Sequence, residues 1–333
     1  TDGAAFDTDP KISPDGHHVA FIRNQNLWVT RLDDKTPHPL TTDGGGAIKN
    51  GMAEFIAQEE MGRQTGYWWS PNSDAIAFLR VDESPIEVTK RYEVQADTIQ
   101  MVDQRYPYAG TANVTYQLGI VSMPSEPGGG HDTQWVDLGA ETDIYIPRVD
   151  WLPSGRSLSY QRQSRDQKTL ELIQYDLQTQ QQKTLVVEQA STWVNLHDDL
   201  HFLSDGSGLI WSSERGGHNH LYFYDFESEQ LQALTQGPWA VDRLEGVDET
   251  LGLVYFTAAY PDPTEKQLLR TSLVTQAPDV VTQVSTKVGW HEVVMDQHAR
   301  FYIDQYSSTT QPPQLALHRS DGERLAWLNE NKV

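Results

Sequence analysis

The sequence predicts an all-β protein with the architecture of a β-propeller, and two observations carry this prediction. A phrase made of an apolar strand, a tight turn and a second alternating strand recurs along the 333 residues about six times. The copies follow one another at a spacing of roughly 45 to 55 residues, which suits propeller blades of four short antiparallel strands. An ordinary β-sandwich with accidentally similar turns is the alternative.

Four copies of the phrase are clear and two are weaker. The clear copies carry the turns PDG, PNS, PSG and SDG, each followed by a strand that ends near a polar turn, as in a β-meander. The clear copies begin at Asp9, Gly66, Pro147 and Asp199, and the weaker ones near Leu244 and His291.

A long insertion separates the strand near Phe78 from the copy that begins at Pro147. Its segment from about Ile86 to Tyr108 is β-rich and charged, so we expect it to project as a hairpin arm. An exposed strand edge of that kind is commonly covered by a partner. A flexible surface loop is the alternative. The later stretch "NVTYQLGIVSM" is expected to complete the interrupted blade as its outer strand.

Composition excludes several classes of function. The chain has 25 Lys and Arg against 47 Asp and Glu, a net charge of −22, which repels phosphate backbones and anionic lipid surfaces. We therefore expect neither a nucleic-acid nor a membrane partner. The chain has no cysteine, hence no disulfide and no thiolate site. It also has no apolar run long enough to span a bilayer, and its start, "TDGAAFDTDP", indicates a cut or processed end.

Familiar catalytic and metal-binding motifs are missing from the sequence. A G-x-S-x-G nucleophile elbow, a His-Glu-x-x-His pattern and a phosphate-cradling glycine loop do not occur. The pair His218 and His220 lies in a predicted blade turn, where a structural role is expected rather than a metal site. The sequence thus predicts no catalytic residue, no metal and no cofactor in this chain.

Glu59 and Glu60 are the candidate binding residues. They lie in "MAEFIAQEEMGRQTG", a predicted short helical insertion that interrupts an otherwise β repeat at the mouth of a blade. Two neighbouring carboxylates repel each other unless they share a cation, and a primary ammonium with three donors fits them well. The pair is therefore expected to bind a free amine. A solvated acidic pair on a helix surface is the alternative.

These motifs together resemble the dipeptidyl peptidase IV family, in the branch that includes bacterial and cytosolic relatives. The resemblance rests on "FIAQEEMGRQTGYWWSP", on the arm and on its sequel "RYPYAGTANVTYQLGIV". The later "SSERGGHNHLYFYD" is similar to blades of the same family, so the resemblance covers nearly the whole chain.

The resemblance implies an eight-bladed propeller that caps a C-terminal α/β-hydrolase domain. Such serine peptidases remove dipeptides from peptide N-termini and prefer Pro or Ala at the second position. By the same likeness, Glu59 and Glu60 would bind the α-ammonium of a peptide substrate, and the arm from about Ile86 to Tyr108 would be a homodimer contact. By likeness to secreted bacterial members of the family, we expect this protein in the periplasm rather than in the cytoplasm.

The sequence departs from the family pattern in three places. Residues 1–333 are all expected to be propeller, and the chain ends at "ERLAWLNENKV", where the family continues into its hydrolase domain. The catalytic triad is then absent, and this chain alone should not hydrolyse peptides. One or more N-terminal blades, with an arginine that helps to hold the substrate carbonyl, are also expected to be missing. Arg63 stands where some members have a small polar residue that contacts extended substrates.

Two other functions compete with this interpretation. A non-enzymatic propeller similar to TolB or WD-repeat scaffolds could use the same blades to hold a protein partner. A prolyl-oligopeptidase type of endopeptidase is disfavoured, because it has no use for an ammonium site. The helix with Glu59 and Glu60 and the arm are the features that a plain scaffold does not need.

Overall fold

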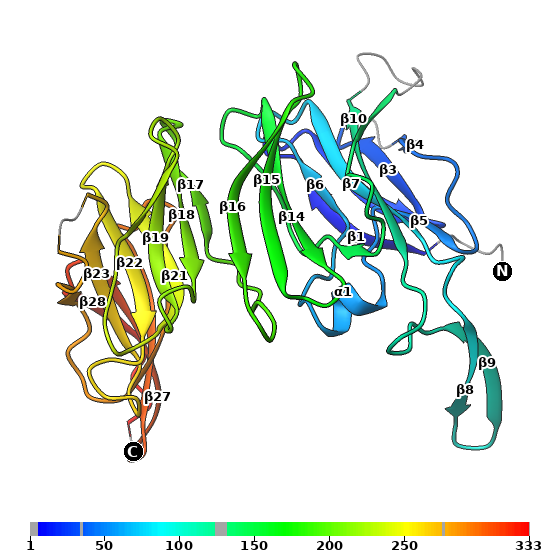
Figure 1. The fold of residues 1–333 in the computed structure, drawn as a ribbon. Coiled ribbons are helices and arrows are strands. Elements are labelled where there is room, and N and C mark those ends of the chain that lie inside the picture. Colours follow the sequence, from blue (N-terminus) through cyan, green and yellow to red (C-terminus); the bar gives the residue numbers. More distant parts are fainter. Residues whose placement is uncertain (1–5, 34–35, 124–131, 275–276, 333) are drawn as a thin grey trace. The chain divides into compact units, whose positions relative to one another are not determined.

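The computed structural model describes residues 6–33, 36–123, 132–274 and 277–332 (Figure 1). The regular secondary structure of this part of the chain consists of antiparallel strands and a single five-residue α-helix. No helix in it is long and apolar enough to cross a membrane. The chain divides into two compact units, Thr1–Leu196 and His197–Val333, and each is described by itself. The all-β prediction is confirmed.

The first unit contains three blade-like sheets in which neighbouring strands follow the order of the chain (Figure 1). The first sheet consists of β1 (Asp7–Ile12), β2 (His18–Arg23), β3 (Asn26–Arg31) and β4 (His38–Pro39). The second consists of β5 (Ile48–Asn50), β6 (Tyr67–Trp69), β7 (Ala75–Asp82), β10 (Thr115–Ser122) and β11 (Thr133–Val136). The third consists of β12 (Ile144–Tyr145), β13 (Val149–Trp151), β14 (Ser157–Ser164), β15 (Thr169–Asp176) and β16 (Gln182–Gln189).

The second unit contains three further four-stranded sheets of the same kind. They consist of β17 (Leu200–Phe202), β18 (Gly208–Ser213), β19 (His220–Asp225) and β20 (Gln230–Ala233); β21 (Val241–Asp248), β22 (Leu253–Ala258), β23 (Gln267–Ser272) and β24 (Thr282–Gln283); and β25 (Trp290–Met295), β26 (Phe301–Ser308), β27 (Gln311–Arg319) and β28 (Arg324–Asn329). The six sheets coincide with the six predicted repeats, so the prediction of blade units is confirmed.

The recurring turns share one backbone geometry. In PDG, PSG and SDG the glycine has a positive φ, at 76° for Gly16, 69° for Gly155 and 74° for Gly206. In PNS the same left-handed conformation falls on Ser73, at 62°. A residue without Cβ adopts this conformation without strain, which explains why glycine follows the polar turn residue in three of the four copies.

The middle sheet of each unit has two apolar faces. In β7 the side chains of Ala77 and Leu79 belong to a core shared with β14 and β15, whereas Ile76 and Phe78 belong to a core shared with β2 and β3. Alternate residues of a strand point to opposite faces, so the second sheet packs between the first and the third. In the second unit, Phe256 of β22 faces one core and Tyr255 the other. This stacking of sheets on both faces is the packing of propeller blades.

The predicted arm is a separate two-stranded sheet of β8 (Val88–Val94) and β9 (Ile99–Arg105). Its strands pair from Val88↔Arg105 at the base to Val94↔Ile99 near the tip. Figure 1 shows this hairpin standing away from the blade sheets of the first unit. The prediction of a hairpin within the interval from Ile86 to Tyr108 is confirmed.

The expected outer strand of the second sheet was wrong. The stretch "NVTYQLGIVSM" contains β10, which pairs with β7 on one side and with β11 on the other, so β11 is the outer strand. Because β10 pairs with β7 along eight residues, its opposite edge still offers backbone donors and acceptors, which residues 133–136 take up. The Gly- and Pro-rich linker between these two strands, at residues 124–131, lies outside the described residues.

Candidate functional site

The helical insertion breaks the first strand of the second sheet in two. Both β5 and β6 pair with the same edge of β7, β5 opposite Arg80–Asp82 and β6 opposite Ile76–Phe78. Residues 51–66 leave the sheet between these two halves and return to it. An isolated bridge between Met52 and Thr65 closes the base of this excursion. The insertion is thus anchored at both ends by one blade.

Helix α1 (Phe55–Glu59) occupies the middle of the insertion and is only five residues long. Glu54 is its N-cap, because one carboxylate oxygen, Oε2, accepts a 2.7 Å hydrogen bond from the amide of Ala57. Glu60 is its C-cap, and Gly62 follows with a φ of 64°. A left-handed glycine just after the last turn ends a helix, so Glu60 lies at the end of α1 rather than within it.

The two predicted site residues, Glu59 and Glu60, are both exposed. Neither side chain makes a hydrogen bond or an ion pair with the rest of the described chain. Adjacent carboxylates without a cation repel each other, and at the end of a short helix they also face its unpaired carbonyl groups. The end of α1 is therefore a local concentration of negative charge that is open to a cationic ligand.

A buried polar cluster of Glu54, Arg63 and Tyr116 connects the start of α1 to strand β10. This cluster was not predicted from the sequence. The Glu54 side chain is only 1% exposed, and its Oε1 accepts a 2.6 Å hydrogen bond from the Tyr116 hydroxyl on β10. The Arg63 guanidinium, also buried, lies 3.5 Å from the same oxygen and donates to the carbonyl of Thr65 at 2.7 Å. An acidic residue directly before an apolar helical stretch is an N-cap signal that could have indicated Glu54.

The electrostatics of this cluster follow from its burial. Burial and the adjacent Glu54 carboxylate raise the pKa of Tyr116 well above its usual value, so Tyr116 remains a neutral hydrogen-bond donor. Burial lowers the pKa of Arg63, and the Glu54 carboxylate opposes this effect. Because Arg63 is directed at Glu54 and at the backbone, it is not available to neutralise Glu59 and Glu60.

The third sheet also contacts the insertion. Arg148, between β12 and β13, donates a 2.8 Å hydrogen bond to the carbonyl of Met61, the residue after Glu60. Burial raises the pKa of Tyr145 on β12, the cation of Arg165 opposes this shift, and the carboxylate of Asp143, followed by those of Glu54 and Glu60, adds to it.

The base of the arm packs on α1. The Phe55 ring contacts the Tyr106 ring edge-on, with centroids 5.0 Å apart, and Tyr106 in turn contacts Tyr108 at 4.7 Å. Arg105, the last residue of β9, donates a 2.6 Å hydrogen bond to the carbonyl of Ile86 and closes the hairpin base. The arm and the helix that carries Glu59 therefore form one continuous packed element.

The histidine pair 218–220 does not form a cluster of ligands. His220 is buried, with Nδ1 3.0 Å from the Thr235 hydroxyl and Nε2 3.1 Å from the carbonyl of Gly237. Burial lowers the pKa of His220, so the ring is a neutral core residue. The part of the chain that the structure describes holds no group of three or more His, Cys, Asp or Glu side chains that could bind a metal ion.

Comparison with known protein families gives one match that covers most of the chain. Residues 1–313 match the family model described as the dipeptidyl peptidase IV N-terminal region. Human dipeptidyl peptidase 8 is 26% identical over 389 residues, which cover 93% of this chain and 43% of that protein. The probable dipeptidyl-aminopeptidase B of Emericella nidulans is 26% identical over 342 residues, which cover 95% of this chain and 37% of that protein.

Solved structures give the same result. The crystal structure of Porphyromonas gingivalis dipeptidyl peptidase 4 superimposes with a TM-score of 0.89 at 27% identity, covering 99% of this chain and 46% of that one. A putative dipeptidyl aminopeptidase IV from Bacteroides ovatus shares the fold, with a TM-score of 0.82 at 23% identity. The chain thus spans about two fifths of the length of the curated relatives that it matches. The six sheets are blades of a β-propeller, and the chain belongs to the family of dipeptidyl peptidase IV N-terminal regions.

Proposed function

We propose that this chain is the substrate-recognising propeller of a serine exopeptidase that releases X-Pro or X-Ala dipeptides from peptide N-termini. In this proposal Glu59 and Glu60 bind the α-ammonium of the substrate. The observation that carries the proposal is the pair of exposed carboxylates at the end of α1, a helix whose first residues are fixed by buried groups. No ion pair joins either carboxylate to a described residue.

The chemistry of the pair fits a primary ammonium. An ammonium carries three N–H donors and a full charge, so it can bridge two carboxylates and remove their mutual repulsion. An acylated N-terminus has neither the charge nor the donors. The same pair would therefore select peptides with a free N-terminus against blocked ones.

The proposed mechanism is one of positioning. Holding the ammonium at a fixed point sets which peptide bond reaches a nucleophile, and such orientation lowers the barrier to reaction. The nucleophile would belong to a C-terminal hydrolase domain of the parent protein, since the sequence of residues 1–333 contains no G-x-S-x-G elbow. The ammonium site on the propeller would then determine that the peptide bond after the second residue reaches the nucleophile, and the hydrolase domain would cleave that bond.

The arm supplies a second element of the proposal. Its hairpin has an exposed apolar face, and a two-stranded sheet alone is marginally stable in water. We propose that a second copy of the parent protein covers this face. Because the base of the arm packs on α1 through Phe55 and Tyr106, a dimer contact would also steady the helix that carries Glu59.

The test uses the parent protein with its downstream domain and a chromogenic Gly-Pro substrate. Wild type is compared with Glu59→Gln, with Glu60→Gln and with the double variant. The double variant is expected to lose about two orders of magnitude in kcat/KM, which corresponds to ~3 kcal/mol of transition-state binding. Glu227→Gln, at an exposed glutamate of the second unit, is the matched control and should retain full activity.

A second substrate separates ammonium binding from a general loss of activity. An N-acylated peptide with the same residues offers no ammonium, so the variants should cleave it as poorly as wild type does. Full activity of the double variant on Gly-Pro would show that the pair is a solvated helix end. A parent protein without any peptidase activity would favour the non-enzymatic scaffold instead.

A further inference from the structure

We propose that a small pocket in the last blade of the second unit binds a small aromatic carboxylate. The pocket has a volume of about 140 Å³ and lies between residues 284–287, which follow β24, and strands β26, β27 and β28. An engineered cavity of about 150 Å³ accommodates benzene, so the pocket has the size of one aromatic ring. The pocket belongs to the second unit, whereas α1 belongs to the first, and the proposal does not depend on the function proposed above.

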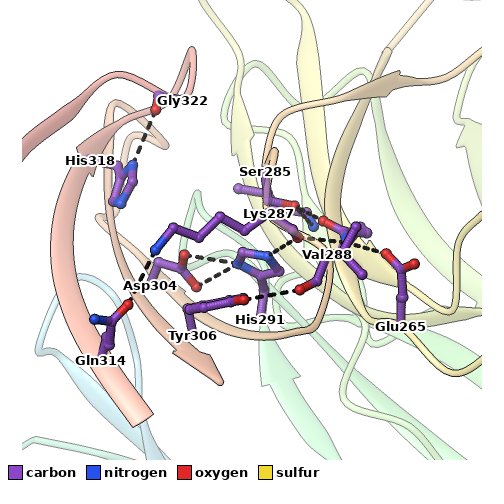
Figure 2. Close-up of polar contacts among 12 residues, drawn as sticks. Glu265, Ser285, Lys287, Val288, His291, Asp304, Tyr306, Gln314, His318 and Gly322 are labelled. Carbon is purple, nitrogen blue, oxygen red and sulfur yellow. Dashed lines mark hydrogen bonds and ion pairs between the residues drawn. The ribbon is translucent and has the colours of Figure 1, made fainter. Parts of the chain in front are cut away.

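The floor of the pocket is a buried pair of side chains whose polar atoms are already satisfied. His291 lies with Nδ1 2.9 Å from a carboxylate oxygen of Asp304 and with Nε2 2.9 Å from the carbonyl of Lys287 (Figure 2). Both residues are buried. The imidazole uses both nitrogens and one of them holds the Asp304 carboxylate, so the floor offers a ligand no unsatisfied hydrogen-bonding group. The Asp304 charge lies at this floor, so the anionic group of a ligand is expected at the opposite, cationic side of the pocket.

Two cations border the pocket without a carboxylate partner. The Lys287 ammonium donates to Gln314 Oε1 at 3.2 Å, as Figure 2 shows, and lies 4.6 Å from the centre of the Tyr306 ring. The Arg324 guanidinium lies 4.3 Å from the Trp327 ring, and the Lys287 ammonium lies 5.3 Å from the same ring. Neither cation makes an ion pair with any described residue, although the whole chain carries a net charge of −22.

These contacts indicate a negatively charged ligand. The Lys287 ammonium has three donors, of which one is used, and the Arg324 guanidinium makes no hydrogen bond with any described residue. A carboxylate placed beside both would form charge-assisted hydrogen bonds, the strong class of such bonds. A cationic ligand would be repelled by the same two groups.

The walls indicate that the remainder of the ligand is a flat ring. Tyr302 and His318 stack at 4.9 Å with an angle of 16° between their planes, and the Trp327 indole lines the same pocket. The His318 ring is fixed by a 3.2 Å hydrogen bond between Nδ1 and the carbonyl of Gly322 (Figure 2). Aromatic pairs gain energy beyond the area that they bury, which a phosphate or an acetate cannot obtain here.

The binding test uses the 333-residue chain with benzoate as the probe, measured by isothermal titration calorimetry. Acetate and benzylammonium, at matched ionic strength, separate the contributions of the ring and the charge. Benzoate is expected to bind saturably, acetate at least tenfold more weakly, and benzylammonium not at all. Benzylammonium binding as tight as that of benzoate would overturn the proposal, as would the absence of saturable benzoate binding.

Variants locate the site. Lys287→Met and Arg324→Gln are each expected to weaken benzoate binding at least tenfold, and Lys168→Met, at an exposed lysine of the other unit, should leave it unchanged. Both substituted side chains are exposed, so the variants should unfold at the wild-type temperature. If either variant fails to fold, NMR of the wild-type chain provides the test. The indole N–H signal of Trp327, assigned by its loss in Trp327→Phe, must shift when benzoate is added to wild type. An unshifted Trp327 signal would exclude this pocket.

Discussion

The Tyr116 hydroxyl and the Glu54 carboxylate form a 2.6 Å hydrogen bond that joins strand β10 to the start of helix α1. Glu54 uses its second oxygen to cap the helix at the amide of Ala57. One buried carboxylate thus links the blade, the helix and the neighbouring Arg63. The positions of the exposed Glu59 and Glu60 carboxylates therefore depend on Glu54, which is itself buried.

Replacing Tyr116 by Phe should destabilise the first unit. The change removes a hydrogen bond to a buried carboxylate, and hydrogen bonds to charged groups contribute about 1.5–3 kcal/mol. Urea unfolding, followed by the fluorescence of the first unit's tryptophans, measures the difference. Tyr92→Phe is the matched control, since Tyr92 is 68% exposed, and it should change the stability by less than about 0.5 kcal/mol. Equal stability of the Tyr116 variant and wild type would contradict a structural role for this bond.

Glu54→Gln should cost more than Tyr116→Phe. The amide keeps an acceptor for Ala57 but removes the negative charge that faces Arg63, and the guanidinium remains buried. Breaking a buried ion pair by removing one partner typically costs about 3–5 kcal/mol. The double substitution Glu54→Gln/Arg63→Met should recover part of this loss, and thermal unfolding of the three proteins measures it. A double variant no more stable than Glu54→Gln would show that the unpaired cation is not the cause.

Gly66→Ala should disturb the base of the helical insertion. A Cβ at Gly66 would lie 2.5 Å from the backbone nitrogen of Met52, and backbone atoms cannot move aside without opening the Met52–Thr65 bridge. We expect a loss of stability of about 1–3 kcal/mol, the range found for overpacked sites. Gly216→Ala is the matched control, because its nearest neighbour is the end of the Tyr222 side chain at 3.3 Å. If the two variants unfold at the same midpoint, the predicted clash at Gly66 is wrong.

The repeats could be predicted from the sequence because each blade carries its own local signals. The turns with Gly16, Gly155 and Gly206 need a left-handed residue, and the blade strands that follow such turns alternate, as in β14, or begin with an apolar run, as in β7. The arm could be predicted as well, because its charged strands interrupt the period of the repeats. These features depend on neighbouring residues in the chain, which a sequence shows directly.

The buried cluster could not be predicted, because it joins residues that are distant in the sequence. Glu54 and Tyr116 are separated by 62 positions, and the alternation of β10 alone does not show which partner the Tyr116 hydroxyl has. The role of β11 was missed for a similar reason. Four residues after a Gly- and Pro-rich linker carry too little pattern to indicate a strand, and only the free edge of β10 gives them one.

The stability of the second unit should fall as the pH rises toward neutrality, because of Glu245. Burial raises the pKa of Glu245 to about 7, partly offset by a 2.9 Å hydrogen bond from the Thr257 hydroxyl. The folded state therefore binds a proton more tightly than the unfolded state, whose pKa lies near the usual 4.5. Between these two values the folded state holds more protons, so stability is lost as the pH increases and is level above about 7.

Glu245→Gln should remove this slope. The amide keeps an acceptor for Thr257 without a charge, so the variant should be more stable than wild type at pH 8 by about 1 kcal/mol, a figure reduced for partial exposure. At pH 4 the two should be equal. Thermal unfolding across this pH range measures the difference, and Glu227→Gln, at an exposed position of the same unit, should follow the wild-type curve. A variant curve parallel to that of wild type would refute the assignment to Glu245.

The arm should mediate dimer formation through one of its two faces. Residues opposite each other in the hairpin, such as Tyr92 and Met101, share a face, and the exposed apolar side chains all fall on that side. This apolar face consists of Val88, Tyr92, Val94, Ile99 and Met101. Tyr92→Asp and Met101→Asp each place a charge in the expected contact and should give monomers, measured by light scattering after size-exclusion chromatography. Gln100→Asp places the same charge on the opposite face and should leave the dimer intact. If Gln100→Asp disrupts the dimer as strongly as Tyr92→Asp does, charge on the arm rather than its apolar face governs association; a wild-type parent protein that is monomeric would exclude the arm as a homodimer contact.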